Sequence, residues 1–243
     1  MNFSFKPHDF EFFIPANCMS CQSICVTQLR LCQSCRRAAF RNEPSEFRNS
    51  GLNVTAATTW IPDENRALSL LLKSLKGNDF REDWAELARE FVARLPLKRL
   101  EPLCPNSTDS GAPKNQRFVL VPAPASSEGR LHALHFAEGI AQLIGLEVFD
   151  VLRHRPSGQS SHQITDASLE GGVPAQKARD KKQRKLRTFY RSRVLPSQCI
   201  PIIVDDIVTS GGTAHAAWQA FGRIEKAQVW CFAHRQLDGR GKL

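Results

Sequence analysis

The distribution of apolar and polar residues after residue 50 predicts helices and strands that follow one another in alternation. Apolar residues recur at helical spacing in three segments, residues 68–76, 84–95 and 132–144. Short apolar runs predict strands in three others, residues 118–121, 146–152 and 229–232. Such alternation is typical of an α/β protein in which helices cover both faces of a parallel sheet.

Segments without this periodicity separate the predicted elements. Residues 43–53 form a polar stretch, and residues 101–116, rich in Pro, Ser, Asn and Gly, predict a loop. Residues 154–175 predict a second loop, rich in Gly and Ser, and residues 177–187 predict a basic helix.

One segment near the C-terminus combines a strand, two acids, a turn and a helix. Residues 202–204 are an apolar, β-branched run that suits a strand buried on both faces of a parallel sheet. Asp205 and Asp206 follow, at the strand end where open α/β sheets bind their ligands. Apolar residues at helical spacing then predict a helix over residues 213–221.

This order of parts suits a sugar phosphate. The two carboxylates can accept hydrogen bonds from two ribose hydroxyls, and the turn can offer N–H and hydroxyl groups to a phosphate at a helix N-terminus. The turn residues are Thr209, Ser210, Gly211, Gly212 and Thr213. A solvated strand end followed by an ordinary turn is the structural alternative. A Walker A loop fits poorly because no Gly-Lys-Ser/Thr follows, and the spacing of a dinucleotide-binding loop is missing.

Four cysteines near the N-terminus have the spacing of a metal site. Cys18 and Cys21 form one C-x₂-C pair, and Cys32 and Cys35 form a second. Four thiolates in two close pairs are the set that structural zinc prefers, so we expect a zinc ribbon over residues 1–48. Cys25 lies between the pairs and is expected to be a spare thiol. A ribbon of this size has no core of its own, so zinc would supply much of its folding energy.

The net charge of +9 comes almost entirely from one segment. Residues 177–193 contain nine Lys or Arg residues and one acid. This segment is either a contact for nucleic acid or polyphosphate, or a solvated basic helix. The candidate contacts to single-stranded DNA are Lys181, Lys182, Arg184 and Lys185.

Length and composition set the outer limits. A chain of 243 residues has room for one ordinary core, expected over residues 49–243, plus a small appendage. The sequence predicts no membrane span, since no segment approaches roughly 18 consecutive apolar residues, and no secretory signal. We therefore expect a soluble cytoplasmic protein whose cysteines are thiols or metal ligands.

The segment from residue 204 to residue 213 resembles the phosphoribosyl pyrophosphate (PRPP) motif of type I phosphoribosyltransferases. The resemblance implies that Asp205 and Asp206, the candidate catalytic residues, contact the ribose 2′ and 3′ hydroxyls. It also implies that the turn residues 209–213 bind the 5′-phosphate. Magnesium in this family binds mainly to the pyrophosphate and ribose oxygens of PRPP, so it would arrive with the substrate.

The order of motifs along nearly the whole chain resembles the ComF family, competence-associated proteins that include GntX-like members. The matching parts are the four-cysteine ribbon, a Leu-Lys-x-x-Gly-like helix, a Val-Pro-x-Pro strand end, the basic segment and the PRPP motif. The resemblance implies a type I phosphoribosyltransferase-like sheet and a link to DNA uptake in natural transformation, alongside a DNA-translocating helicase. Residues 123–126, including Ala125 and Ser126, would then present backbone N–H groups to pyrophosphate.

The chain departs from this family at one point. The family usually carries Arg-Gly-Phe-Asn-Gln after the Val-Pro-x-Pro strand, whereas residues 134–138 read Leu-His-Phe-Ala-Glu. Three readings stay open: an enzyme that transfers phosphoribosyl to a nitrogen acceptor, a module that senses PRPP or a nucleotide phosphate and binds single-stranded DNA or a partner, and a structural zinc-ribbon adaptor. His132 and His135 are expected to be satisfied histidines rather than catalytic groups. The loop over residues 153–177 is expected to close over an active site.

Overall fold

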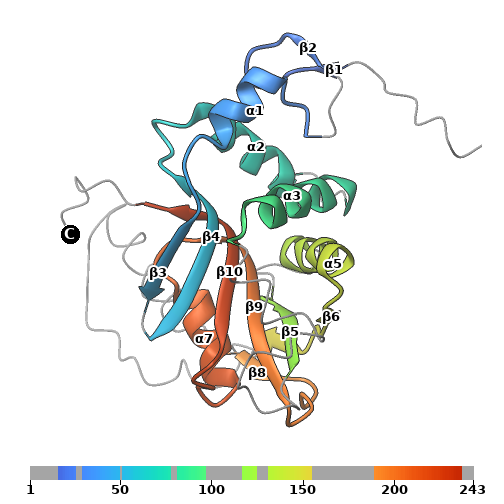
Figure 1. The fold of residues 1–243 in the computed structure, drawn as a ribbon, viewed down its shortest axis with the longest axis vertical. Helices are drawn as coiled ribbons and strands as arrows, with labels where there is room; N and C mark the ends of the chain where they lie inside the picture. Colours follow the sequence, from blue (N-terminus) through green and yellow to red (C-terminus); the bar gives the residue numbers. More distant parts are fainter. Residues whose placement is uncertain are drawn as a thin grey trace, which may run out of the picture.

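The computed structural model describes residues 16–25, 29–49, 51–77, 81–96, 117–124, 131–154 and 189–236. Within them a six-stranded sheet has the order β3-β4-β10-β9-β5-β6 (Figure 1). β3 pairs antiparallel with β4, and every other neighbouring pair in this sheet is parallel. Its strands are β3 Ser45–Asn49, β4 Leu52–Trp60, β5 Arg117–Pro122, β6 Glu147–Val148, β9 Cys199–Val208 and β10 Gln228–Arg235. The predicted α/β class is confirmed.

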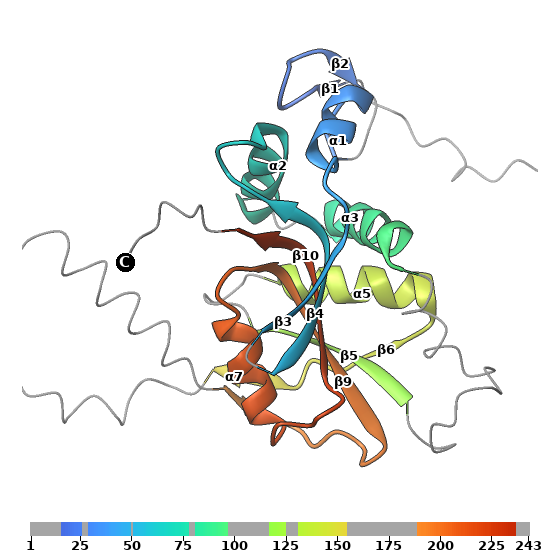
Figure 2. The ribbon, with the colours of Figure 1, turned by 60° about the vertical axis from the view of Figure 1, so that its left-hand side comes forward.

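Helices cover both faces of this sheet. α2, α3 and α5 pack with one face, and α7 packs against the other together with the short pair β7–β8 (Figure 2). The helices described are α1 Gln33–Ala39, α2 Arg66–Gly77, α3 Arg81–Arg94, α5 His132–Ile144 and α7 Gly212–Ala220. The remaining strands are β1 Ala16–Asn17, β2 Ile24–Cys25, β7 Leu152–His154 and β8 Phe189–Arg191.

β9 divides its side chains between the two cores. Ile202 and Val204 belong to the cluster under α2, α3 and α5, whereas Ile203 belongs to the cluster under α7. All three are fully buried. A strand with parallel neighbours and helices on both faces has no solvent side, which is why its sequence is continuously apolar rather than alternating.

α3 and α5 approach closely because Gly139 has no side chain. A Cβ at Gly139 would lie 2.7 Å from the Cβ of Ala88, which is shorter than any ordinary contact. The glycine is therefore required by helix packing, and its backbone stays in the helical region. This packing holds the first turn of α5 in place, where the site described below begins.

Two segments differ from the sequence prediction. The polar stretch over residues 43–53 contains β3 and the start of β4, because β3 is an edge strand with half-exposed polar side chains. β4 continues with Ala and Thr residues that are buried without being strongly apolar, so no apolar run marked it. The strand predicted over residues 146–152 divides into β6 and β7, since the chain turns away where Val151 N–H donates to Phe149 O.

The N-terminal segment packs against the helices beside the end of the sheet where β4 and β10 finish (Figures 1 and 2). Arg36 in α1 forms ion pairs of 2.9 Å with Glu90 and 3.1 Å with Glu86, both in α3. The Asn65 amide, just before α2, donates to Ala39 O at 2.9 Å. The predicted division after residue 48 falls within β3, which belongs to the sheet, and the two-domain organisation stays a prediction.

Part of what the sequence predicts falls outside the described residues. The loop over residues 101–116, the basic helix over residues 177–187 and most of the loop over residues 153–177 lie there. In the described part of the chain, no helix combines the length and the apolar character needed to cross a membrane.

Candidate functional site

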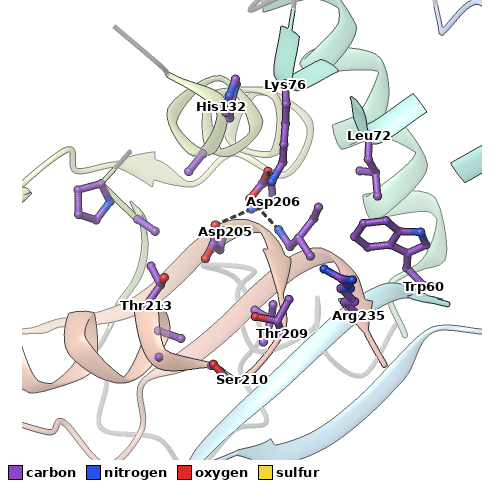
Figure 3. Close-up of a pocket in the computed structure, with 18 of the residues that line it drawn as sticks. Trp60, Leu72, Lys76, His132, Asp205, Asp206, Thr209, Ser210, Thr213 and Arg235 are labelled. Carbon is purple, nitrogen blue, oxygen red and sulfur yellow. Dashed lines mark hydrogen bonds and ion pairs between the residues drawn. The ribbon is translucent and has the colours of Figure 1, made fainter. Parts of the chain in front are cut away.

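A cavity of about 430 Å³ opens where the parallel strands of the sheet end (Figure 3). Its walls come from the ends of β4, β5, β9 and β10, from the last turns of α2, and from the first turns of α5 and α7. The lining includes the two predicted acids and all five predicted turn residues: Asp205, Asp206, Thr209, Ser210, Gly211, Gly212 and Thr213. Residues that the sequence marked as a sugar-phosphate site therefore share one cavity.

The two acids lie within β9, which continues to Val208. Asp206 N–H donates to Asp205 Oδ1 at 2.9 Å, and Ile207 N–H donates to Asp206 Oδ1 at 2.8 Å. These hydrogen bonds fix both carboxylates against the backbone at the cavity floor. Each acid keeps a second oxygen for another partner.

A lysine from the opposite wall supplies positive charge to this pair. Lys76, in the last turn of α2, brings Nζ to 2.9 Å from Asp206 Oδ2 (Figure 3). Asp206 is only 8% exposed, so water hydrates its charge poorly, and the Lys76 ammonium balances that charge instead. Burial raises the pKa of Asp205 well above its usual value and the adjacent Asp206 raises it further, while Lys76 acts in the opposite direction.

The turn after β9 allows a ligand to come close to the backbone. Gly211 has φ of +73°, a left-handed conformation that favours glycine, and α7 begins at the next residue. A Cβ at Gly211 would lie 2.5 Å from Asn49 Nδ2 at the end of β3. The first N–H groups of a helix have no partner within it, so those of α7 are positioned to meet an anion from the cavity.

The neighbouring strand β5 supplies fewer N–H groups than the resemblance implied. Ala123 N–H donates to Val204 O at 2.8 Å, and Pro124 has no N–H group. Both residues line the cavity, but neither can donate a backbone hydrogen bond to a pyrophosphate. That part of the expectation is wrong, and Ala125 and Ser126 lie outside the described residues.

Three lining residues that sequence reasoning missed come from elements other than β9 and α7. They are Lys76, Trp60 at the end of β4 and Arg235 at the end of β10. The Arg235 guanidinium carbon lies 5.3 Å from the centroid of the Trp60 ring, as in a cation–π contact. The rule that ligands gather at the carboxyl ends of parallel strands would have found Arg235, had β10 been extended beyond residue 232.

Of the two histidines in α5, His132 lines the cavity and His135 does not. His132 lines the cavity and its ring stands 5.2 Å from that of Trp84. His135 lies with Nδ1 3.6 Å from Glu138 Oε2, and Glu138 also pairs with Arg81 of α3 at 3.0 Å. His135 therefore contributes to the contact between two helices and does not line the cavity.

The four predicted metal ligands form a second site. The sulfur atoms of Cys18, Cys21, Cys32 and Cys35 all lie within 4.8 Å of one another, and those of Cys21 and Cys32 are 3.6 Å apart. Tetrahedral zinc with bonds of about 2.3 Å places its sulfurs roughly 3.8 Å apart, so the cluster fits such an ion. Cys25 is buried in the apolar core and is not part of this cluster.

The surroundings of the sulfurs also suit a cation. Burial by itself raises the pKa of the Cys18 thiol, but N–H groups of Cys21 and Cys32 donate to its sulfur, and the pKa falls to about 6. At Cys35 a hydrogen bond from Ser20 lowers the pKa, but burial and the neighbouring thiols raise it to about 12. Four thiolates so close together need a metal ion such as zinc to balance their charge.

The chain matches no model of a known protein family, and no curated protein matches it. The predicted DNA contacts Lys181, Lys182, Arg184 and Lys185 lie outside the described residues.

Proposed function

We propose that the cavity binds PRPP or a related ribose 5-phosphate, and that the chain is a ComF-like protein with a type I phosphoribosyltransferase-like domain. One observation carries the proposal: the paired acids of β9 and the glycine turn before α7 line the same cavity, which is of a size to hold a phosphorylated sugar. In this proposal Asp205 and Asp206 accept hydrogen bonds from the ribose hydroxyls, and residues 209–213 hold the 5′-phosphate.

Lys76 has a place in this arrangement. Its ammonium already lies 2.9 Å from Asp206, and Lys73, one turn earlier on α2, lines the same cavity. Both can turn toward a pyrophosphate, which would compensate for the arginine that the ComF pattern has and this chain lacks. Magnesium would enter bound to the pyrophosphate and ribose oxygens.

The reaction that fits these groups is a displacement at the anomeric carbon. A nitrogen lone pair of the acceptor forms the new bond, the bond from that carbon to pyrophosphate breaks, and pyrophosphate leaves with the bonding electrons. The acceptor nitrogen then loses its proton to solvent. The protein contributes positioning and charge balance, and no covalent intermediate with the chain is needed.

A ComF-like role would connect this chemistry to DNA uptake, with single-stranded DNA and a DNA-translocating helicase as partners. In the alternative without catalysis, the same cavity senses PRPP or a nucleotide phosphate. The cysteine cluster would hold structural zinc in both cases. Release of pyrophosphate from PRPP in the presence of a nitrogen acceptor separates the enzyme from the sensor.

The test is a melting experiment with PRPP and magnesium. Ligand at about 100 times its Kd stabilises a protein by about 2.7 kcal/mol, which raises the Tm of a chain this size by roughly 5–10 °C. Asp206→Asn should abolish the rise. Glu225→Gln, an exposed acid before β10 at the opposite end of the sheet, is the matched control and should keep it. A wild-type Tm that PRPP and magnesium do not change would exclude the proposal.

A further inference from the structure

One end of the cavity is not explained by a ribose, a phosphate or a pyrophosphate. It is formed by Trp60, Leu72 and Arg235, on the side of β9 where β10 and β4 lie. Trp60 and Arg235 are paired in the parallel register of these two strands, and both are the last residues of their strands. Figure 3 shows their side chains next to each other, with Leu72 above the indole.

The indole of Trp60 is held in a fixed position. Its Nε1–H donates to Ser69 Oγ at 2.9 Å, and Ser69 Oγ in turn lies 2.9 Å from both Pro62 O and Asn65 O. The indole N–H is therefore already used within the protein. What Trp60 offers to the cavity is a rigid aromatic surface, next to the aliphatic side chain of Leu72.

Arg235 adds a positive charge over part of this surface, with its guanidinium carbon 5.3 Å from the centroid of the Trp60 ring. Within the described residues Arg235 forms no ion pair with a carboxylate, and its guanidinium lies over the Trp60 ring. The acids that line the cavity are the two of β9, and Asp206 has Lys76 as its partner. A guanidinium beside an aromatic ring can form two parallel hydrogen bonds with a carboxylate.

The opposite flank of β9 has different chemistry. There the lining residues are Ala123, Pro124, His132 and Ala133, from the end of β5 and the start of α5. A pyrophosphate has no apolar surface and gains nothing from an indole and a leucine. A flat ring gains from both, because it buries its faces against them.

From these contacts we infer that Trp60, Leu72 and Arg235 form the acceptor subsite, and that it selects a planar aromatic or heteroaromatic ring carrying a carboxylate. The ring lies against Trp60 and Leu72 and its carboxylate binds Arg235. The inference rests on the proposed function, since it is the ribose held by Asp205 and Asp206 that makes this ring the acceptor.

The experiment measures binding of two matched pairs of probes to the full-length chain: orotate against uracil, and nicotinate against nicotinamide. Each pair keeps the ring and differs in the carboxylate. Isothermal titration should show the carboxylates binding at least about tenfold more tightly than their neutral partners. Arg235→Gln should remove this preference, and Arg235→Lys should retain part of it, because lysine keeps the charge but not the paired donors.

The ring contact has its own variants. Trp60→Phe keeps an aromatic surface and should bind orotate within a few-fold of wild type, whereas Trp60→Leu should weaken both orotate and uracil about tenfold or more. If Trp60→Leu does not fold, Leu72→Ala takes its place as the variant that removes apolar surface. Equal binding of charged and neutral probes, or a preference that survives in Arg235→Gln, would overturn the inference.

The outcome is separable from that of the proposed function. A chain that PRPP stabilises but that does not discriminate orotate from uracil keeps the proposed function and loses this subsite. A chain that discriminates the probes through Arg235 but does not respond to PRPP loses both the proposed function and the acceptor role.

Discussion

The cysteine cluster and the cavity both concentrate acidic groups, but they balance the negative charge in different ways. The cluster contains four sulfurs within 4.8 Å of one another, a set that a metal ion such as zinc can neutralise as thiolates. The cavity has two carboxylates and a built-in counter-ion, the Lys76 ammonium at 2.9 Å. We therefore expect the cluster to depend on its metal ion for folding, and the cavity to fold without a ligand.

The largest effect should come from breaking the cluster. Cys32→Ser removes one of four ligands, and we expect zinc to be lost together with more than about 5 kcal/mol of metal-dependent stability in the N-terminal segment. Metal content per chain and urea unfolding with and without a chelator measure both effects. Cys25→Ala, a buried cysteine outside the cluster, should keep zinc. A wild-type chain that takes up no zinc would contradict this difference between the two sites.

A smaller effect is expected at the cavity turn. Gly211→Ala places a side chain at φ of +73°, which costs about 1–2 kcal/mol, and directs a Cβ at Asn49. The response of Tm to PRPP and magnesium should be lost while zinc stays bound.

The matched control is Gly145→Ala at the end of α5. Gly145 has φ of +72° with nothing within 4 Å of an added Cβ, so it carries a similar strain without a neighbour to displace. It should keep the PRPP response. Equal loss of that response in both variants would show that general destabilisation, and not the turn, is responsible.

The smallest effect concerns Asp205 and pH. Its pKa is raised in the folded chain, by burial first, so between its usual pKa near 4 and the raised value the folded state binds the proton that the unfolded state has lost. Stability then falls as pH rises through this window. Asp205→Asn should stabilise the chain at neutral pH, because the neutral amide avoids the cost of the buried charge, and the gain should fade toward pH 4.

Urea unfolding of wild type and Asp205→Asn at intervals from pH 4 to pH 8 measures this dependence. Glu225→Gln, at an exposed position, should show no comparable trend. A gain for Asp205→Asn that is constant with pH would mean that the carboxylate is not destabilised by its surroundings.

The cavity residues of β9 and the following turn could be predicted from the sequence, whereas those from β4, β10 and α2 could not. Asp205, Asp206 and the turn residues are contiguous in sequence, and their chemistry follows from a strand, a turn and a helix that form locally. Lys76, Trp60 and Arg235 come from three distant elements. The sheet order, in which β10 lies between β4 and β9, brings Trp60 and Arg235 to the cavity, and the last turn of α2 brings Lys76.

The difference between local and long-range contacts also explains why the sequence pattern predicted β9 but not β3 and β4. β9 is buried on both faces and has a continuous apolar run, so the pattern was clear. β3 lies at an edge, and β4 is filled with Ala and Thr, whose small side chains are buried by their neighbours rather than by their own hydrophobicity. β4 is placed in the sheet by pairing with β10, far along the chain, and β3 is placed by pairing with β4.

Helix α2 links the cysteine-bearing segment to the cavity through contacts at its two ends. Asn65, just before its first turn, bonds to the carbonyl of Ala39 in the cysteine-bearing segment, and Lys76 in its last turn reaches Asp206. Its 12 residues form a continuous helix about 18 Å long. The position of the Lys76 ammonium in the cavity therefore depends on the contact between the start of α2 and the cysteine-bearing segment, as well as on the sheet.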